Sequence, residues 1–415
     1  MARVLLLLPV AGYRNEDFLA AAQRLEVEVI AIADYCPRLA PRWGLSPLAA
    51  VPFDRPQLAV EIVLKHLTAR PDAVLAADDH GVELAALLRE RLGLAGNPPA
   101  AVARLRDKLE FRQLLREAAL SCPPFAHLPD EVEPDTWQPP CDYPVVVKAR
   151  RLSASRAVVR ADDAASFASA VRQARRIQRY ADRQAGQLGL LVEAFIPGRE
   201  YALEGLLDDG RLRVLALFDK PDPLDGPYFE ETLYVTPSRL PAATQQAIAD
   251  AVQRACRAAG LVTGPVHAEM RVNDAGVWLL EIAPRAIGGL CGRVLRHALG
   301  MSLEELILRH ALGQPVPEAT AGEGAGVMMI PIPRRGIYEG VDHLQKAAAV
   351  PGITDIQITV EAGTLLKPVP EGASYLGFIF ARAADATAAE TALRAAHAQL
   401  ALRIRPEVEL VPSDG

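Results

Sequence analysis

Cysteine is scarce in this chain and is never arranged as a metal or disulfide motif. Five cysteines are scattered over 415 residues, without a CxxC pair or the spacing of a zinc site. A sparse, odd-numbered set is typical of proteins whose thiols stay reduced, so we expect free cysteines that serve as small core or surface residues. They are Cys36, Cys122, Cys141, Cys256 and Cys291.

Membrane-spanning runs and an excess of basic charge are also lacking. The apolar run at residues 4–8 is too short to cross a bilayer, and it has no convincing basic flank or small-residue cleavage site. We therefore expect a buried strand there and a cytoplasmic protein without a membrane partner. The formal net charge of −6 argues against a general nucleic-acid binder, so an acidic substrate would need a local basic pocket.

The first segment lacks a glycine-rich dinucleotide fingerprint, although its pattern is α/β. Residues 1–95 alternate apolar strands with helices, which predicts a doubly wound parallel sheet. The turn at residues 9–13 is not glycine-rich, which disfavours a Rossmann cofactor. Ligands of such sheets bind beyond the carboxyl ends of the strands, where Asp78, Asp79 and His80 would either contact substrate or cap the next helix.

The rest of the chain is long enough for further domains, since its length predicts two to four in all. Its prolines and glycines indicate loops and helix ends, and its apolar patterns indicate strands and helices. The expected elements are a helix at about 97–120, a loop at 131–142, a strand at 143–149, a helix at about 164–184, a boundary at 322–326 and a last helix at about 387–401.

The residues around positions 274–276 are predicted to form a β-hairpin. Both flanks alternate or are apolar, and the sequence Asp-Ala-Gly between them suits a three-residue hairpin loop. Closure of that loop would pair Asn273 with Val277. Counting back along both strands then places Glu269 opposite Glu281.

These two opposed glutamates predict a metal site. Paired side chains on neighbouring strands lie roughly 5 Å apart at their Cβ atoms, where like charges repel each other. A divalent cation would relieve that repulsion, and oxygen ligands suit Mg²⁺, which usually also keeps waters and phosphate oxygens. The alternative is a solvated hairpin edge that carries Glu269 and Glu281 for unrelated reasons.

Cationic and small residues that suit a polyphosphate precede the hairpin. Lys108 lies in a helix and Lys148 ends a strand, and lysines from two elements would neutralise phosphate charge together. In the loop after Lys148, Ser153 and Ser155 are small enough to let backbone N–H groups approach phosphate oxygens, and Arg156 adds charge. The alternatives are solvated amines and a plain hairpin turn.

A nucleoside pocket is predicted between the loop at 153–156 and the hairpin. Two carboxylates there would accept hydrogen bonds from an adenine amino group and from ribose hydroxyls, and neighbouring backbone groups would contact the ring edge. Leu279, expected on the same strand face as Glu281, would form an apolar floor under the base, with core packing as the alternative. The other residues expected around the nucleoside are Glu193, Phe195, Ile196 and Glu200.

In their order along the chain these motifs resemble those of the ATP-grasp superfamily, over almost the whole chain. The resemblance implies that both lysines bind ATP phosphates, that residues 153–156 form a flexible lid loop and that the paired glutamates hold Mg²⁺ or Mn²⁺. It also implies that Arg285 binds the transferring phosphoryl group. The motifs are the N-terminal α/β unit, Asp107-Lys108, Val147-Lys148, Glu193 with Pro197-Gly198-Arg199-Glu200, and Glu269 with Glu281.

The chain departs from the family pattern at two positions. Ala283 stands where the family commonly has an asparagine as a further metal ligand, which puts a second metal ion in doubt. Ala157 stands where the lid often has a glycine, which would stiffen the lid. Neither departure removes the paired glutamates.

Within the superfamily, residues 225–238 and the segment from about Gly326 resemble L-amino acid ligases and related carboxylate–amine ligases. The resemblance implies a small carboxylate, such as an amino acid, as one substrate and an amine as the other. Tyr228 would then contact substrate. Glu230 and Glu231 would bind either the acceptor ammonium or the metal.

The implied reaction activates a carboxylate with ATP as an acyl phosphate, which the amine attacks to give a dipeptide or related amide, ADP and phosphate. The planar fork of Arg285 would bind phosphate or carboxylate oxygens. Gly288 and Gly289 would offer backbone N–H groups to the anionic intermediate. His267, expected on the strand face of Glu269, would take the amine proton or serve a structural or substrate-contacting role.

We therefore predict an α/β fold, α+β overall, of the ATP-grasp type, with small-molecule carboxylate and amine substrates. A homodimer is the commonest assembly on general grounds. The alternatives are a nucleotide-binding regulatory protein without turnover, which Ala283 favours, and a purine-pathway or biotin-carboxylase-like ligase. The expected domains are a doubly wound parallel-sheet domain at 1–95, a linker helix and loop at 96–142, a lid subdomain at 143–200, an antiparallel-sheet ATP-grasp core at 201–325 and a small α+β ligase-type domain at 326–415.

Overall fold

The structure is a computed structural model that describes residues 1–9, 12–34, 47–181, 188–318, 322–372 and 375–407. The chain folds into two compact units. The first unit contains Met1–Cys122, Glu200–Asp219 and Pro237–Gly322, and the second contains Pro123–Arg199, Lys220–Thr236 and Glu323–Gly415. The five-domain division is finer and stays a prediction. Cys36 lies outside the described residues, and the other four cysteines are free thiols.

The first unit begins with the parallel sheet that the sequence predicts. Its strands lie in the order β3-β2-β1-β4, and each strand pairs in parallel with its neighbours. Apolar residues 4–8 are completely buried in β1. Strand β3, which is only three residues long, is not predicted from the sequence. The elements are β1 (Arg3–Leu8), α1 (Asn15–Arg24), β2 (Glu28–Asp34), β3 (Ala49–Val51), α2 (Pro56–His66), β4 (Ala73–Ala76) and α3 (Val82–Leu92).

The single helix expected at 97–120 is wrong, because the chain forms two helices there. They are α4 (Pro99–Arg106) and α5 (Lys108–Glu117). Asp107 between them has an extended backbone, and its side chain accepts a hydrogen bond of 3.0 Å from the Leu109 N–H. Asp107 is therefore the N-cap of α5 and places Lys108 in the first turn of that helix.

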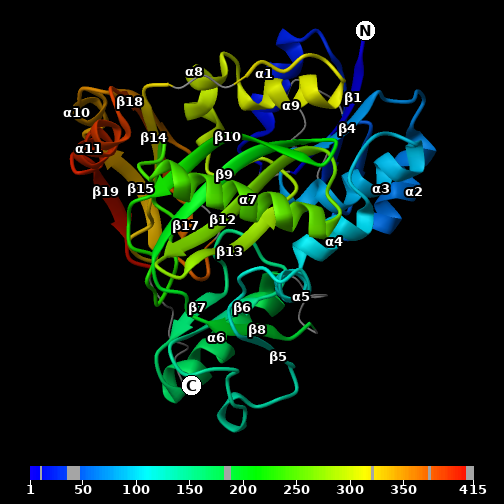
Figure 1. Ribbon diagram of the computed structural model, residues 1–415. Helices are drawn as coiled ribbons and strands as arrows, with labels where there is room; N and C mark the ends of the chain where they lie inside the picture. The colour runs from blue at the N-terminus through cyan, green and yellow to red at the C-terminus, as the bar shows by residue number, and fades with distance from the viewer. Residues whose placement is uncertain (10–11, 35–46, 182–187, 319–321, 373–374, 408–415) are drawn as a thin grey trace, which may run out of the picture. The chain divides into compact units, whose positions relative to one another are not determined.

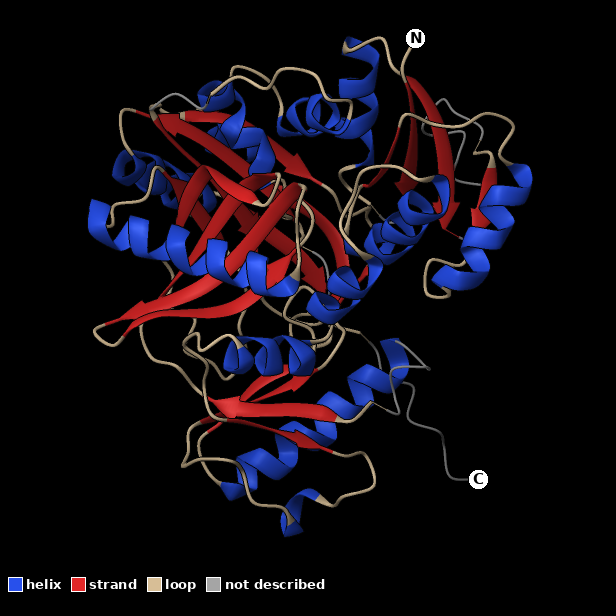
Figure 2. Cartoon of the chain, turned by 45° about the vertical axis from the view of Figure 1, so that its right-hand side comes forward, coloured by secondary structure: helices blue, strands red, loops and turns tan. Residues whose placement is uncertain are grey.

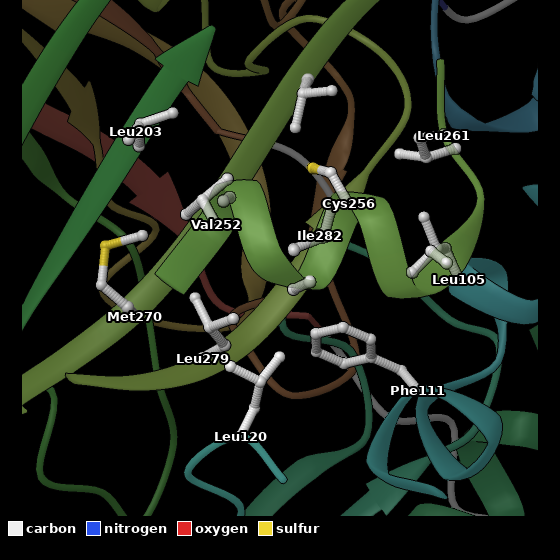
Figure 3. Close-up of a cluster of buried hydrophobic side chains, with 14 of the residues drawn as sticks. Leu105, Phe111, Leu120, Leu203, Val252, Cys256, Leu261, Met270, Leu279 and Ile282 are labelled. Atoms are coloured by element: carbon white, nitrogen blue, oxygen red, sulfur yellow. The ribbon is translucent and has the colours of Figure 1, made fainter. Parts of the chain in front are cut away.

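The main sheet of the first unit has neighbouring strands in the order β13-β12-β9-β10. Helix α7 packs on it (Figure 1) and buries an apolar cluster that includes Val252, Cys256, Met270 and Leu279 (Figure 3). The remaining elements of this unit are β9 (Arg199–Asp208), β10 (Arg211–Lys220), α7 (Ala242–Ala259), β12 (Gly264–Asn273), β13 (Gly276–Ala283), α8 (Arg296–Leu299) and α9 (Leu303–Ala311).

The second unit contains a four-stranded antiparallel sheet in the order β5-β8-β6-β7. Helix α6 packs along one face of that sheet, as Figure 2 shows, and buries Phe167 and Val171 in an apolar cluster. The expected end of this helix near residue 184 lies outside the described residues. The elements are β5 (Phe125–Leu128), β6 (Val145–Ala149), β7 (Val158–Ala161), α6 (Ala164–Ala181) and β8 (Leu190–Ala194).

The C-terminal part of the second unit has neighbouring strands in the order β11-β14-β18-β16 and a small sheet in the order β17-β15-β19. The last helix ends at His397 and not near residue 401, since a further strand begins at Ala401. The elements are β11 (Leu233–Thr236), β14 (Gly324–Ile330), β15 (Gly336–Asp342), α10 (Leu344–Ala348), β16 (Ile353–Ile358), β17 (Leu365–Leu366), β18 (Gly377–Ala383), α11 (Ala386–His397) and β19 (Ala401–Arg405).

Among the described residues, no helix combines the length and the apolar character that crossing a bilayer requires.

Candidate active site

The hairpin of β12 and β13 pairs Glu269 with Glu281, as the sequence predicts, but by a different register. Asn273 pairs with Gly276 and not with Val277, so the turn is one residue shorter than expected. A bulge between Glu269 and Met270 on one strand and Leu279 and Glu281 on the other restores the pairing. The two deviations cancel at the position of the glutamates.

The bulge changes the expected place of Leu279. Paired residues share a face of the sheet, so Leu279 lies on the face of Met270, whereas Glu281 lies on the face of Glu269. Leu279 is 1% exposed and belongs to the apolar core under α7. The expectation that it shares a face with Glu281 is therefore wrong. Leu280 occupies the extra position beside Glu281, and its carbonyl accepts a hydrogen bond from Arg112.

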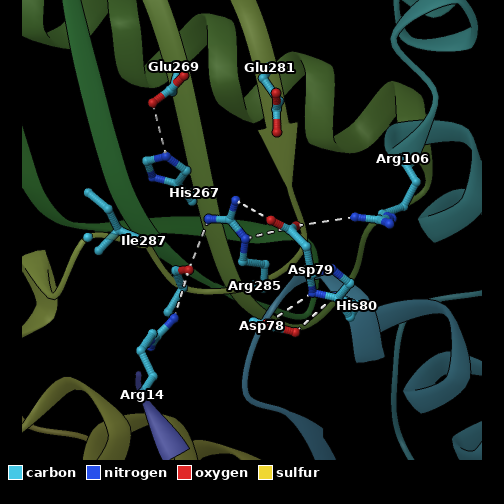
Figure 4. Close-up of polar contacts among 12 residues, drawn as sticks. Arg14, Asp78, Asp79, His80, Arg106, His267, Glu269, Glu281, Arg285 and Ile287 are labelled. Carbon is cyan, nitrogen blue, oxygen red and sulfur yellow. Dashed lines mark hydrogen bonds and ion pairs between the residues drawn. The ribbon is translucent and has the colours of Figure 1, made fainter. Parts of the chain in front are cut away.

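Both glutamates of the pair are partly accessible, and each has a cationic neighbour. The side chains of Glu269 and Glu281 are 17% and 30% exposed. The Nζ of Lys108 lies 3.7 Å from a carboxylate oxygen of Glu281. The Nε2 of His267 lies 3.5 Å from a carboxylate oxygen of Glu269 (Figure 4).

His267 is buried between two carboxylates. Its Nδ1 lies 3.6 Å from Glu204, which is completely buried, and its Nε2 faces Glu269. Burial alone lowers the pKa of His267, but the interactions with both glutamates outweigh burial and raise that pKa to about 9. His267 therefore carries a proton at neutral pH. Glu204 also accepts a hydrogen bond of 2.9 Å from the N–H of Ile287, which ties the loop after β13 to β9.

Arg285 forms a two-bond ion pair with Asp79. Its Nε and Nη2 donate to the two carboxylate oxygens of Asp79 at 2.9 and 2.8 Å (Figure 4). Arg106 lies 3.7 Å from the same carboxylate. Burial alone raises the pKa of Asp79, but the two guanidinium groups outweigh it and hold that pKa well below its usual range. The fork that the sequence assigns to phosphate is thus filled by a protein carboxylate.

The turn after β4 shows the capping role that the sequence left open, while the substrate contact stays a prediction. Asp78 accepts a hydrogen bond of 2.9 Å from the His80 N–H and so caps the short helical turn that follows β4. Asp79 points away to Arg285. The carboxyl end of the parallel sheet therefore supplies a residue that contacts the predicted catalytic arginine.

The Gly288-Gly289 turn already has a partner for one of its N–H groups. The Gly289 N–H donates a hydrogen bond of 2.7 Å to the Tyr13 hydroxyl. A Cβ atom on Gly288 would lie 3.0 Å from the same hydroxyl, which is closer than ordinary packing allows. Tyr13 therefore sets the position of this turn, and the predicted role of Gly289 as a donor to substrate would require exchange of that hydrogen bond.

Glu200 is paired with an arginine on the strand of Glu269. The Nε of Arg271 donates to a carboxylate oxygen of Glu200 at 3.3 Å, and both side chains are almost fully buried. Arg271 and Glu269 lie two residues apart and so share a face of β12. The predicted ribose contact of Glu200 stays a prediction.

In the second unit, Lys148 and Glu193 form a close ion pair. The Nζ of Lys148 lies 2.7 Å from a carboxylate oxygen of Glu193 across the antiparallel pairing of β6 and β8. The Glu193 side chain is 3% exposed and that of Lys148 is 12% exposed. The structure thus brings together a residue expected to bind phosphate and a residue expected to bind adenine.

The loop between β6 and β7 has an unusual backbone. Ala154, Ser155 and Ala157 all have positive φ angles, between 53° and 56°, although none is glycine. The Ala157 N–H donates to the Pro370 carbonyl at 3.2 Å, and Ser153 accepts from the Arg156 N–H at 3.4 Å. Burial lowers the pKa of Arg156. Each of these residues has a Cβ atom, which makes left-handed backbone costly, so contacts such as that with Pro370 must hold the loop in this state.

Aromatic contacts surround Phe195 in the second unit. The Arg160 guanidinium lies 4.3 Å from the centre of the Phe195 ring, and Phe229 stacks on the same ring at 6.4 Å. Arg160 also donates to the Asp225 carbonyl at 2.7 Å. The neighbouring Ile196 is buried. Phe195 therefore contacts the segment at residues 225–238, which the sequence assigns to substrate binding, through the Phe229 ring.

The three predicted substrate contacts have different surroundings. Tyr228 is 38% exposed, and its hydroxyl lies 3.4 Å from the side-chain oxygen of Gln173. Burial raises the pKa of Glu230, which accepts a hydrogen bond from the Ile332 N–H. Glu231 is 3.0 Å from the Nζ of Lys220. Both glutamates line a small pocket in the second unit.

Sequence reasoning missed several residues of the first unit. Glu204 lies in an apolar run that is typical of a buried strand. A charged residue in such a strand needs a partner, and this could have identified Glu204 as a site residue. Tyr13 and Arg106 carried no signal, because their partners Gly289 and Asp79 are distant in the sequence.

Two family models match the chain in separate segments. Residues 141–294 match the ATP-grasp domain, and residues 328–405 match the L-amino acid ligase C-terminal domain 2. The crystal structure of L-amino acid ligase from Bacillus licheniformis superposes with a TM-score of 0.79 at 24% identity, over 98% of this chain and 99% of that chain. These matches confirm the fold class that the sequence predicts.

Curated relatives are similar over parts of their length. Carnosine synthase 1 of Gallus gallus is 31% identical over 329 residues, which are 72% of this chain and 35% of that protein. D-alanine--D-alanine ligase of Gloeobacter violaceus is 29% identical over 236 residues, which are 53% of this chain and 73% of that protein. The chain thus spans about a third of the length of the first of these relatives.

Proposed function

The chain belongs to the ATP-grasp superfamily, and from that premise we propose that it is an ATP-dependent carboxylate–amine ligase. In this proposal it activates a small carboxylate, such as an amino acid, as an acyl phosphate. It then joins the acyl group to an amine to give a dipeptide or related amide. The match of residues 328–405 to the L-amino acid ligase C-terminal domain 2 supports this subclass.

The observation that carries the proposal is the pairing of Glu269 with Glu281 beside Lys108. Two carboxylates on one strand face, each partly accessible, offer the oxygen ligands that suit Mg²⁺ or Mn²⁺. The donor set therefore fits a divalent ion, which when bound would neutralise charge on the ATP phosphates. Ala283 occupies the position of a further metal ligand, but its methyl side chain has no atom that could coordinate a metal, and it is only 4% exposed.

Arg285 and Lys108 would bind the anionic groups of the reaction. Asp79 holds the Arg285 guanidinium in one orientation through two hydrogen bonds, so little order is lost when an anion arrives. Lys108 is a point charge in the first turn of α5. A transferring phosphoryl group or substrate carboxylate would share Arg285 with Asp79.

In this proposal His267 is not the general base of the resting enzyme. A pKa near 9 means that the imidazole holds its proton at neutral pH, where a base must be unprotonated. The contacts with Glu204 and Glu269 favour the structural role that the sequence left open.

The second unit contributes its own ATP contacts in this proposal. Lys148 and Glu193 would bind phosphate and adenine, and their ion pair keeps both charges compensated until the nucleotide arrives. Ser153, Ser155 and Arg156 would form the lid loop. Phe195 and Ile196 would offer backbone groups to the ring edge. Leu280, which precedes Glu281 in the first unit, replaces Leu279 as the apolar residue proposed beside the base.

The decisive experiment is a screen of amino acids and amines for ADP release, followed by mass analysis of the products. The proposal predicts that ADP forms only when a carboxylate is present, and that an amide whose mass equals the two substrates minus water accumulates with it. A protein that binds ATP but releases no ADP with any pair would instead be regulatory, the alternative that Ala283 favours. Release that depends on bicarbonate would support the biotin-carboxylase-like alternative.

A further inference from the structure

The first unit contains a cavity that the proposed metal and nucleotide residues do not line, although the predicted catalytic Arg285 lies at its border. It has a volume of about 100 Å³ and lies along the edge strand β4, between helix α3 and the loop at 284–286. A single water needs only roughly 10–15 Å³ of such volume, so the cavity has room for a small organic molecule. Its apolar wall includes Val74, Val82 and Ala85, all buried.

One cation in this wall has no carboxylate partner among the described residues. The Nε of Arg89 on α3 donates to the Val74 carbonyl at 2.8 Å, and no ion pair of the described chain involves this arginine. Burial lowers the pKa of Arg89 to about 10, and no acidic neighbour offsets that effect. Arg89 is partly buried and lines the cavity, so the guanidinium N–H groups that do not bond to Val74 are available to an anion there.

The other charged groups of the lining are already engaged. Arg14 pairs with Glu304 at 3.2 Å, and Arg285 pairs with Asp79. The carboxylate of Asp72, at the outer end of β4, accepts a hydrogen bond of 2.7 Å from the Arg3 N–H. The remaining basic residue of the lining, His310, lies 3.9 Å from Asp208. The positive charge left for a ligand is therefore concentrated at Arg89.

We propose that this cavity is a binding site for a small aliphatic carboxylate, separate from the site of ligation. Its carboxylate would bind the Arg89 guanidinium, and its carbon chain would lie against Val82 and Ala85. The cavity also borders Arg285 and Ala286, so an occupant would contact the loop that carries the predicted catalytic arginine. The occupant is thus placed to act as an effector of that loop, drawn from free metabolites or from the reaction's own carboxylates.

Butyrate is a suitable probe, because it combines one carboxylate with a short apolar chain. Isothermal titration of the full chain with butyrate should show saturable binding without ATP or amine. Arg89→Gln should weaken that binding by roughly tenfold to a hundredfold, since a charge-assisted hydrogen bond is lost. The matched control is Arg70→Gln, because Arg70 donates to the Leu92 and Gly93 carbonyls at the end of the same helix but does not line the cavity.

A second variant tests the position of the guanidinium without removing its charge. A Cβ atom on Gly96 would lie 2.4 Å from the Arg89 side chain, so Gly96→Ala should displace that flexible chain and weaken butyrate binding. A crystal soaked with 4-bromobutyrate should place the bromine beside Ala85 by anomalous scattering. Equal butyrate affinity in the wild-type and Arg89→Gln proteins would overturn the proposal. Failure of the wild-type protein to bind butyrate would also overturn it and leave a water-filled cavity. Neither result depends on ligase turnover.

Titration of amino acids distinguishes free metabolites from substrate carboxylates as the source of the ligand. Each amino acid is tested with its α-carboxylate free and with that carboxylate blocked as an amide. Only compounds that bind through the carboxylate should compete with butyrate.

Discussion

Each predicted functional carboxylate of the first unit that is named below has a cationic neighbour in the protein. Glu269 faces His267, Glu281 faces Lys108, and Asp79 fills the fork of Arg285. Such pairs keep charged side chains ordered and compensated in the free protein. Substrates must then compete with, or be added to, contacts that already exist.

Replacement of Glu281 should separate chemistry from folding. Glu281→Gln removes one proposed metal ligand while it preserves the size of the side chain, so ADP release should fall at least about a hundredfold, as for loss of a major charge-stabilising group. A coupled ADP assay measures the loss, and circular dichroism checks the fold. The control Glu90→Gln alters an exposed glutamate on α3 and should keep normal turnover. Near-normal turnover in Glu281→Gln would contradict the metal assignment.

Loss of the Asp79 carboxylate should lower stability in a pH-dependent way. Asp79→Asn removes the carboxylate that pairs with the buried Arg285 guanidinium, which should cost about 3 kcal/mol of the free energy of unfolding at pH 7. Because the pKa of Asp79 is held well below its usual range, its contribution is complete above pH ~4 and is lost as the pH falls further. Urea unfolding at pH 7, 5 and 3 should therefore show a difference between the two proteins that shrinks only at the lowest pH.

The control for this pH series is Asp135→Asn. Asp135 pairs with Arg172 in an exposed ion pair, and such pairs contribute little. A difference between the wild-type and Asp79→Asn proteins that stays constant from pH 7 to pH 3 would show that the Arg285 pair does not depress the Asp79 pKa.

At the scale of elements, the loop between β6 and β7 stores backbone strain. Ala157 has a φ angle of 54° and is completely buried, while its N–H donates to Pro370. Left-handed backbone costs an alanine roughly 1 kcal/mol that a glycine does not pay. The loop is held in this state by its neighbours, and its stiffness is a property of this chain.

Ala157→Gly should loosen the loop. Removal of the Cβ relieves the left-handed strain but restores freedom to the unbound loop, so cleavage within residues 150–157 by a low dose of trypsin should become faster. Limited proteolysis followed by mass spectrometry measures this. The matched control is Ala161→Gly, a completely buried alanine within β7, which should lower the melting temperature without selective cleavage of the loop. Unchanged cleavage of Ala157→Gly would mean that neighbouring contacts, and not Ala157, set the stiffness.

The hairpin of β12 and β13 shows how an element can reach a predicted pairing by an unpredicted path. A two-residue turn displaces the register by one, and a bulge before Glu281 displaces it back. The same bulge turns Leu279 into the core and leaves Leu280 beside the glutamates. Pattern counting could find the glutamate pair, but not the bulge, because the bulge depends on how β13 packs against α7 and Arg112.

At the scale of the whole molecule, ATP with Mg²⁺ should stabilise the protein, because a ligand that binds only the folded state raises the free energy of unfolding. A ligand at a hundred times its dissociation constant adds about 2.7 kcal/mol to the free energy of unfolding. The melting temperature should therefore rise with ATP and Mg²⁺, and EDTA should remove the increase. In Glu281→Gln the increase should be smaller. A melting temperature that does not change when ATP and Mg²⁺ are added would contradict nucleotide binding.

The sequence by itself determined what local patterns and pairs can encode. Alternating and apolar runs defined the parallel sheet of residues 1–95 and the hairpin strands, because periodicity follows directly from which face is buried. The order of acidic and basic motifs indicated the superfamily, and the opposition of Glu269 and Glu281 followed from counting along two strands.

Only the tertiary structure decided which polar groups meet. Asp79 with Arg285, Glu204 with His267 and Tyr13 with Gly289 each join segments at least 60 residues apart. No periodicity links such residues, since their proximity results from the packing of whole elements against one another. The same packing left Arg89 beside a cavity without a carboxylate partner among the described residues, which the sequence of α3 alone would not reveal.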